Sequence, residues 1–514
     1  MNDRILVLGG GPNGLACATR LAKAGRAVTL LEARGQLGGL AASEEFHPGF
    51  RTAGVHLDSG RLRPAVVEEL GLTGHGLAYR HTEAARYAPS PIGPPVVVHP
   101  GDENATVAAL DAHHRSDGVS YRMWRAFLGR MTPFLQGVLD AAPPDVEART
   151  LPALWELGKT ALGLRRLGKR DMSELLRVGP MCVADWLNES FQTDRLKVLL
   201  AVPGVAATWT GPWSAGSALQ LMLSEVMTHR SVIGGPAAVA RALESAARGA
   251  GVEIRTDAPV ERILFADGAV SGVQLAGGEE LAAPVLAATC EPKRALLDLI
   301  AKRDLPPLLE RRAQAWRTRG TTAVLHLALD GPLVFQGCED QKVESAVLGT
   351  DLDGLEKAFD PVKYGELPEE PCLELRVPSV GDESLAPRGK HVATVHAHFV
   401  THDPKGGWTD TNRGAVGKAI LAVLARHAVD LPATVVGSEL LTPADLEQRY
   451  GLTGGQLNHG EPALDQMLHM RPNPECARYA TPLTGLYLCG SGNHPGGGVT
   501  GMPGLLGARA ILGE

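Results

Sequence analysis

The strongest constraint on the fold lies in the first 32 residues, which predict a strand, a turn, a helix and a second strand. The apolar run ILVL at 5–8 precedes GGGPNG at 9–14, an Ala- and Leu-rich segment that ends at Lys23, and a second apolar run at 27–31. In such a unit the three glycines of GxGxxG allow the tight turn, the approach of a pyrophosphate and the packing of helix on strand. The N-terminus therefore predicts a Rossmann-type dinucleotide-binding unit.

The residues after the second strand indicate which dinucleotide binds. Glu32 lies 18 residues after Gly14, close to the spacing of about 20 at which an acidic residue binds the ribose hydroxyls. Arg34 could instead clamp the 2′-phosphate of NADP, but Glu32 would repel that phosphate. A second glycine pair follows at Gly38-Gly39. A nicotinamide domain has no need of this pair, so the sequence favours a flavin.

A second glycine-rich stretch, CGSGNHPGGGVTGMPG at 489–504, contains seven glycines in sixteen positions. It follows a short apolar run at 485–489, which predicts a buried strand, and precedes a predicted helix at 505–512. A strand-to-helix crossing of this kind presents backbone N–H groups and a positive helix end to a ligand. We expect it to wrap the ribityl chain and the pyrimidine edge of the isoalloxazine.

The middle of the chain contains a third candidate piece of the cofactor domain. Gly234-Gly235 precedes a predicted helix at 238–247, two predicted strands at 252–255 and 259–265, and a hairpin turn at Asp267-Gly268. On its local pattern alone, this segment fits an ordinary αβ unit equally well.

These motifs resemble the phytoene desaturase and carotenoid dehydrogenase-like flavoproteins, and within them the branch of the pyridine nucleotide-disulfide oxidoreductase domain-containing protein 2. The resemblance rests on GGGPNGLACATRLAKAGRAVTLLEAR, LGG and GLYLCGSGNHPGGGVTGMPG, and it extends to segments 175–201 and 454–472. Flavin-amine oxidases usually carry an acidic residue at the position of Ser491, and the family commonly has arginine at the position of Leu40. The motifs and the resemblance together assign to FAD Gly9, Gly11, Pro12, Asn13, Gly14, Glu32, Ala33, Arg34, Gly38, Gly39, Leu40, Val260, Gly490, Ser491, Gly498, Val499 and Thr500.

The resemblance implies an α/β fold in which a Rossmann-type FAD domain is interleaved with an α+β substrate domain of mixed sheet and helices. A chain of 514 residues is too long for one compact core. We expect an FAD-binding domain at 1–60, 232–304 and 443–514, and a substrate-binding domain at 61–231 and 305–442. The second domain should contain short strands near 87–98, several helices, and strands at 322–329 and 391–399.

Composition limits the partners and the compartment. The net charge of −7 gives no reason to expect nucleic acid. Seven cysteines without a CxxC pair predict a reducing compartment and argue against a disulfide reductase mechanism. The first predicted strand starts too near Met1 to leave room for a signal peptide, and no apolar run reaches the roughly 18 residues of a membrane span. The sequence therefore predicts a cytoplasmic protein.

The segment ELGKTALGLRRLGKRDMSELL, at 156–176, raises the question of a membrane. Five basic residues alternate there with leucines, as in a helix that lies on an anionic bilayer and admits a lipophilic substrate. A solvated charged face over a packed stripe would give the same pattern. Peripheral membrane contact and an ordinary surface helix both remain open.

A flavin dehydrogenase needs few catalytic side chains, because the cofactor carries the chemistry and the protein orients the substrate. The candidates for proton transfer are His494 and His56, with His459 a weaker one, since histidine titrates near neutral pH. The aromatic content of 4% argues against an aromatic cage around an amine and favours a channel lined by Leu, Val, Ala and Met. The pair His113-His114 has no partner pair at a useful spacing, so no metal site is expected.

The sequence thus predicts an FAD-dependent dehydrogenase or desaturase that transfers a hydride from a lipophilic, cyclic or secondary-metabolite substrate, at a C–C or C–N bond, to flavin N5. A saturase or isomerase that uses reduced flavin, and an amine oxidase, remain alternatives. A flavoprotein scaffold is the alternative that is not an enzyme. The sequence does not indicate the electron acceptor.

Overall fold

The computed structural model describes residues 4–146, 149–227 and 230–514. Its first layer is a parallel five-stranded sheet with the order β17 (Leu486–Leu488), β11 (Val285–Ala288), β1 (Ile5–Leu8), β2 (Val28–Leu31) and β7 (Glu253–Arg255). The strands predicted at the N-terminus, at 252–255 and before the C-terminal glycine-rich stretch are confirmed. Segments from both ends of the chain therefore meet in one sheet.

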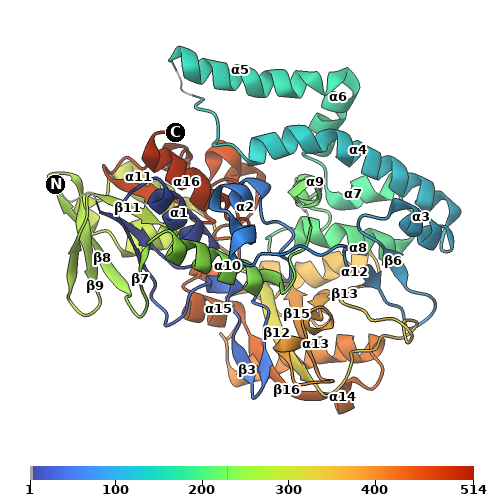
Figure 1. Ribbon diagram of the computed structural model, residues 1–514. Helices are drawn as coiled ribbons and strands as arrows, with labels where there is room; N and C mark the ends of the chain where they lie inside the picture. The colour runs from blue at the N-terminus through green and yellow to red at the C-terminus, as the bar shows by residue number, and fades with distance from the viewer. Residues whose placement is uncertain (1–3, 147–148, 228–229) are drawn as a thin grey trace.

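Alternating side chains of this sheet pack in two separate apolar cores, one on each face. Ile5, Val7 and Leu30 face a helical layer, whereas Leu6, Leu8 and Leu31 face the opposite side. The helical layer contains α1 (Pro12–Lys23), α2 (Pro64–Leu70), α10 (Gly235–Gly249) and α16 (Met502–Leu512) (Figure 1). The opposite side is covered by a three-stranded antiparallel sheet, β10 (Glu280–Ala282), β9 (Ala269–Leu275) and β8 (Val260–Ala266), and by α11 (Pro307–Ala315). This is the Rossmann-type α/β unit that the glycine motif predicts.

A second, mixed sheet of seven strands has the order β16 (Val435–Leu441), β12 (Thr322–Leu329), β15 (His391–His398), β14 (Leu373–Arg376), β13 (Ser345–Leu348), β5 (Arg86–Ala88) and β6 (Val96–Val98). Because successive side chains in a strand point to opposite faces, each strand divides its residues between two environments. Ala393, Val395 and Ala397 of β15 pack in an apolar core with α13 (Asp410–His427). The other face presents Thr394, His396 and His398.

A layer of helices packs near this sheet and forms its own core. It contains α3 (Glu103–Asp111), α4 (Arg115–Leu139), α7 (Val183–Asn188), α8 (Asp194–Val205), α9 (Ser217–Met227) and α12 (Leu352–Phe359). The remaining regular elements are the hairpin β3 (Glu45–His47) and β4 (Phe50–Arg51), α14 (Leu431–Thr434) and α15 (Pro443–Tyr450). The helices and strands expected in the two excursions of the chain are confirmed.

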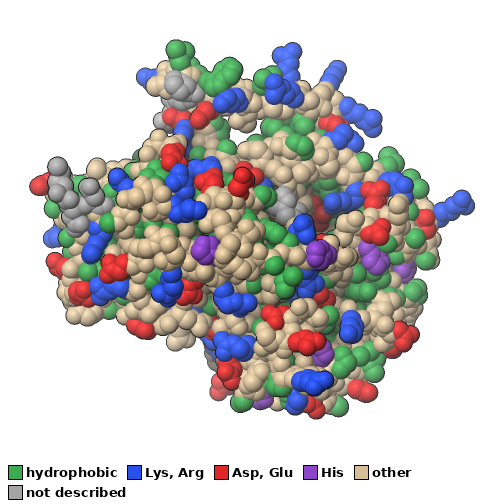
Figure 2. Space-filling model, in the orientation of Figure 1, with side chains coloured by type: hydrophobic (Ala, Val, Ile, Leu, Met, Phe, Trp, Pro, Cys, Tyr) green, Lys and Arg blue, Asp and Glu red, His purple; other side chains and the backbone are tan. Residues whose placement is uncertain are grey.

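The basic segment at 156–176 forms an arm rather than one amphipathic helix. α5 (Leu151–Arg166) and α6 (Gly168–Val178) are separate because Gly168 adopts a positive φ of 81°. The arm lies along the top of Figure 1, and its basic side chains project outward in Figure 2. Leu151 and Trp155 are 84% and 66% exposed. Within the described ranges, no helix combines the length and the apolar character that crossing a membrane requires.

Candidate functional site: a dinucleotide cradle beside a buried cavity

The turn between β1 and α1 is closed on one side and open on the other. A Cβ atom on Gly14 would lie 1.9 Å from the carbonyl oxygen of Gly9, so the helix packs directly on the turn. A Cβ atom on Gly11 would meet nothing within 4 Å. α1 starts at Pro12 and has no side-chain cap, so the positive end of the helix faces the open side, as an anion site requires.

Glu32 lies at the end of β2, where a ribose would be held. Its side chain is buried, with one oxygen accepting from the Gly10 amide at 2.6 Å and the other from the Arg34 amide at 2.8 Å. The guanidinium of Arg34 pairs with Glu44 and stacks 4.7 Å from the ring centre of Tyr450. These contacts hold Arg34 beside Glu32 but leave its Nη1 without a partner among the described residues, whereas Ala33 is exposed.

The second glycine pair lies across the first turn. The Gly38 amide donates to the Gly10 carbonyl at 2.8 Å, and a Cβ atom on Gly39 would lie 3.3 Å from the Cα of Gly11. Both glycines have positive φ, 106° and 52°, which other residues rarely adopt. Leu40 is buried, and its carbonyl accepts from the Val55 amide at 2.8 Å.

The C-terminal glycine-rich stretch joins the N-terminal turn, although the two lie at opposite ends of the chain. Asn13 Nδ2 donates to Ser491 Oγ at 2.9 Å. A Cβ atom on Gly504 would lie 1.9 Å from the Asn13 carbonyl oxygen, so α16 and α1 pack backbone to backbone. α16 also has no side-chain cap, and its N-cap residue Gly501 has a positive φ of 67°. Two uncapped helix N-termini thus lie close together.

The remaining predicted cofactor residues surround this junction. Gly490, Val499 and Thr500 are buried, and Gly498 has a positive φ of 94°. Val260 starts β8, beside the end of β2, because the Ala258 amide donates to the Glu32 carbonyl at 2.9 Å. The structure therefore brings all four predicted segments together, and we call them the cradle: 9–14, 32–40, 258–260 and 490–504.

The cradle has the chemistry of a dinucleotide site. Asn13 Oδ1 and Arg34 Nη1 are buried and have no hydrogen-bond partner among the described residues, which is costly unless a ligand supplies one. The open side of Gly11 and the uncapped start of α1 add backbone donors. These features fit a pyrophosphate flanked by a ribose.

A cavity of about 750 Å³ borders the cradle, and residues of the same glycine-rich stretch line it, including His494, Gly496 and Gly498. Its helical wall comes from α4, α8 and α9. It carries the apolar residues Leu135, Leu139, Leu200, Leu219, Leu223 and Met227 together with the polar residues Arg125, Gln220, Ser224 and Glu225. The facing wall comes from the seven-stranded sheet, with Arg86, Glu374, Arg376, His396 and His398. The expected channel of Leu, Val, Ala and Met thus accounts for only part of the lining, because both walls also carry polar and charged side chains.

The three predicted histidines lie at or near this cavity; His494 is buried, and His56 and His459 are half-buried. Burial lowers the pKa of His56 to about 3 and those of His459 and His494 to about 4, so all three are neutral at pH 7. His494 Nε2 lies 3.0 Å from the Val138 carbonyl, and its own carbonyl accepts from Tyr479 Oη at 2.9 Å. His459 lies outside the cavity lining, with its carbonyl accepting from Trp316 Nε1 at 3.0 Å.

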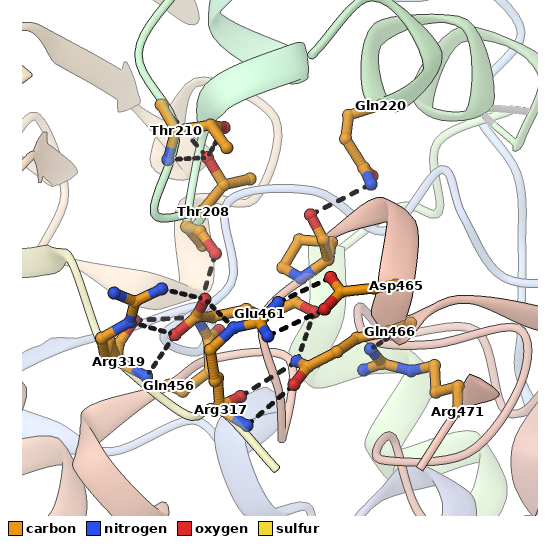
Figure 3. Close-up of polar contacts among 12 residues, drawn as sticks. Thr208, Thr210, Gln220, Arg317, Arg319, Gln456, Glu461, Asp465, Gln466 and Arg471 are labelled. Atoms are coloured by element: carbon orange, nitrogen blue, oxygen red, sulfur yellow. Dashed lines mark hydrogen bonds and ion pairs between the residues drawn. The ribbon is translucent and has the colours of Figure 1, made fainter. Parts of the chain in front are cut away.

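Sequence reasoning missed Arg471, which braces the glycine-rich stretch. Its guanidinium is buried and donates to the carbonyls of Ser491 and Asn458, both at 2.8 Å. Figure 3 shows Arg471 beside a second network, in which the buried Glu461 accepts from Arg319 at 2.6 Å and from Arg317 at 3.3 Å. These contacts fix the segment 456–471 against the cavity. No local motif marks them, because the partners come from distant parts of the chain.

Comparison with known proteins agrees with this geometry. Residues 7–61 match the model of the NAD(P)-binding Rossmann-like domain. The chain is 30% identical to pyridine nucleotide-disulfide oxidoreductase domain-containing protein 2 of Rattus norvegicus, with 99% of this chain and 93% of the relative covered. It is 26% identical to a limonene dehydrogenase component of Castellaniella defragrans (99% and 94% covered). It is 24% identical to phytoene desaturase (neurosporene-forming) of Cereibacter sphaeroides (99% and 94% covered).

Among solved structures, an oxidoreductase from Methanosarcina mazei superposes with a TM-score of 0.60 at 15% identity, covering 99% of this chain and 100% of that one. The fold and the cradle define the class: the chain is an FAD-dependent oxidoreductase with a Rossmann-type domain. Within that class, it belongs to the family of pyridine nucleotide-disulfide oxidoreductase domain-containing protein 2. The resemblance predicted from the motifs is confirmed. All seven cysteines are free in this structure.

Proposed function

We propose that this protein is an FAD-dependent dehydrogenase that removes a hydride from a lipophilic substrate held in the 750 Å³ cavity. The observation that carries the proposal is the double role of the stretch 490–498. Ser491 contacts Asn13 in the cradle, while His494, Gly496 and Gly498 line the cavity. A cofactor held in the cradle therefore has a direct path to the substrate space. The relatives named as a dehydrogenase and a desaturase also support removal of a hydride from the substrate.

The cradle residues would divide the cofactor between them. Glu32 would accept hydrogen bonds from ribose hydroxyls, and the backbone of 9–14 with the start of α1 would bind the pyrophosphate. Gly38 and Gly39 would follow the pyrophosphate and ribityl chain, and Val260 would meet the adenine. Gly490, Ser491 and 498–500 would hold the flavin end. When bound, FAD accepts the hydride at N5.

The protein's own contribution is to orient the substrate and to manage one proton. His494 holds the glycine-rich stretch through its two hydrogen bonds, so we assign it a positioning role. His56 lines the cavity and is neutral, so it has a free lone pair for a substrate proton. Its low pKa makes it a weak base, which suits a reaction in which most of the catalysis comes from binding.

We also propose the domain boundaries expected from the sequence, with the FAD domain at 1–60, 232–304 and 443–514 and the substrate domain at 61–231 and 305–442. The strands of the parallel sheet and those of the seven-stranded sheet fall on opposite sides of these boundaries. We depart from these boundaries in one place: the segment 62–77 packs with α1 and α16 in the core of the first sheet, so we assign it to the FAD domain.

The arm α5–α6 supports peripheral contact with an anionic membrane, from which a lipophilic substrate could enter. Exposed apolar side chains such as Leu151 and Trp155 lie on the arm that carries Arg165, Arg166 and Lys169. Sedimentation with phosphatidylserine vesicles tests this contact. We expect Trp155→Ser with Arg166→Glu to abolish binding, and equal binding by wild type and variant would refute it.

Anaerobic incubation of the purified holoprotein with lipophilic alkenes, alcohols and secondary amines tests the proposed function. We expect one class to bleach the flavin band, which oxidised flavin generally shows at about 450 nm. The control is free FAD with the same compounds. If no compound bleaches the flavin but a polyene reoxidises the dithionite-reduced protein, hydride transfer runs from flavin to substrate. That result would indicate a saturase. Bleaching by amines alone would indicate an amine oxidase.

A further inference from the structure

The sheet side of the cavity carries ionisable side chains that the proposed hydride transfer does not use. We define the polar wall as Glu374 and Arg376 of β14 and His396 and His398 of β15. The register places Glu374 directly opposite His396, with His398 two residues further along the same face of β15. All four side chains line the cavity, so a substrate that fills the space must meet them.

Glu374 is a carboxylate with too few donors. Burial alone would raise its pKa, but contacts with His398 and the nearby His396 and Arg86 lower it to about 2, so the group is ionised at neutral pH. Its nearest polar partner among the described residues is His398 Nε2, at 3.4 Å. An ionised carboxylate has about four lone-pair sites, so Glu374 can accept further hydrogen bonds from a ligand in the cavity.

His398 is equally short of partners. Its side chain is 1% exposed, and neither ring nitrogen has a hydrogen-bond partner in the part of the chain that the structure describes. Such a group is costly in a protein interior unless a ligand or water satisfies it. A buried imidazole without a hydrogen-bond partner and a half-buried carboxylate beside it, both on one cavity wall, therefore indicate a binding site.

Most of the neighbouring donors are already engaged elsewhere. His396 Nε2 lies 2.8 Å from the Val55 carbonyl, and Arg86 Nη2 donates to the Leu199 carbonyl at 2.9 Å. Arg125 pairs with Glu225 at 2.7 Å. Arg376 has no hydrogen bond or ion pair among the described residues, so it and a ligand in the cavity are the donors left for Glu374.

We propose that the polar wall is a recognition subsite for a hydroxyl group, so that the substrate is an alcohol-bearing lipophile with its apolar body against α4, α8 and α9. The hydroxyl would donate to Glu374 and exchange a hydrogen bond with His398. A carboxylate would be repelled by Glu374. An ammonium would meet the guanidinium groups of Arg86 and Arg376 on the same wall, so a neutral donor fits best. The inference rests on the proposed function only for the identity of the cavity as the substrate site.

Four matched probes test this subsite without any redox reaction: 1-hexanol, hexylamine, hexanoate and 1-methoxypentane, which is an ether of hexanol's size that cannot donate. Their affinities for the oxidised holoprotein can be measured by calorimetry. We expect hexanol to bind at least about tenfold more tightly than the ether, the ratio typical of a hydrogen bond to a charged group. We expect Glu374→Gln to reduce that ratio severalfold, because its neutral amide oxygen is a weaker acceptor than the carboxylate.

Glu370→Gln is the matched control, because that carboxylate precedes the same strand but is 71% exposed and pairs with Arg426. Its ratio should stay at the wild-type value. Equal affinity of the wild type for hexanol and the ether would overturn the inference, even if Glu374→Gln does not fold. Tightest binding of hexylamine or of hexanoate would also overturn it. Flavin bleaching is a separate readout. Selective binding of hexanol without bleaching would contradict the proposed dehydrogenase function and leave the hydroxyl subsite standing.

Discussion

The cradle and the polar wall border the same glycine-rich stretch, but they are built to recognise ligands in different ways. The cradle presents main chain: open glycine backbone and two helix N-termini without side-chain caps. The polar wall presents side chains from two strands whose opposite face packs in an apolar core. Main-chain recognition depends on the fold itself, whereas side-chain recognition can change without it. Substitutions in the two regions should therefore separate folding, cofactor binding and substrate selection.

The largest effect is expected for Gly14→Ala. The added Cβ atom would lie 1.9 Å from the Gly9 carbonyl oxygen, so α1 must move off the turn at a cost of about 3 kcal/mol or more in the free energy of unfolding. Urea unfolding, followed by circular dichroism with and without added FAD, measures this cost. A variant as stable as the wild type would mean that the close packing of turn and helix is not needed.

A pH titration of stability probes five histidines with lowered pKa values, of which His326 and His459 lie outside the cavity lining. Burial lowers the pKa of His56 and His326 to about 3 and of His396, His459 and His494 to about 4. The unfolded chain therefore takes up protons below about pH 6.5 while the folded chain does not, so stability falls as the pH drops toward 4. Each histidine contributes about 2 kcal/mol of loss between pH 6.5 and 5.

The control for this titration is an exposed histidine. The urea midpoint should fall less steeply with acid in His326→Asn than in the wild type, whereas His81→Asn, which changes an exposed residue, should leave the slope unchanged. Identical slopes in all three proteins would show that the buried histidines do not govern acid stability.

Gly11→Ala should separate cofactor binding from folding. Its Cβ atom would meet no protein atom within 4 Å, so the chain should remain as stable as the wild type in the absence of FAD. The same atom would project toward the pyrophosphate, and we expect the affinity for FAD to fall at least about tenfold. Fluorescence titration of the apoprotein with FAD measures it. Unchanged affinity would place the pyrophosphate elsewhere.

A smaller effect is expected at the contact between the two ends of the chain. Ser491→Ala removes the acceptor for Asn13 Nδ2 and should lower the free energy of unfolding by about 1 kcal/mol. Ser491→Thr keeps the hydroxyl and serves as the control. Equal losses in the two variants would mean that the size of the side chain, rather than the hydrogen bond, matters there.

The difference between main-chain and side-chain recognition also explains how much of the site the sequence could predict. Backbone geometry is set by neighbours in sequence, so the cradle residues lie in short local motifs. The sequence alone therefore identifies the strand at 5–8, Glu32 and the stretch 489–504. The alternation in HVATVHAH at 391–398 could have indicated a strand with one polar face. It could not show that β14 would place Glu374 opposite His396, because strand pairing depends on segments far apart in the chain.

The arm shows a second limit of the sequence. The leucine and arginine pattern at 156–176 predicts a helix, but the positive φ of Gly168 divides it into α5 and α6. A glycine within a helical pattern can be tolerated or can end a helix, and tertiary packing decides which outcome occurs.

The central claim is that cofactor binding depends on the cradle and not on the polar wall. The direct test is the ratio of FAD to protein, from chromatography of the cofactor released on denaturation, in the wild type, Gly11→Ala and Glu374→Gln. We predict about one FAD per chain in the wild type and in Glu374→Gln, and little in Gly11→Ala. A wild-type protein that holds no FAD even after incubation with it, or a Glu374→Gln variant that loses it, would contradict the account.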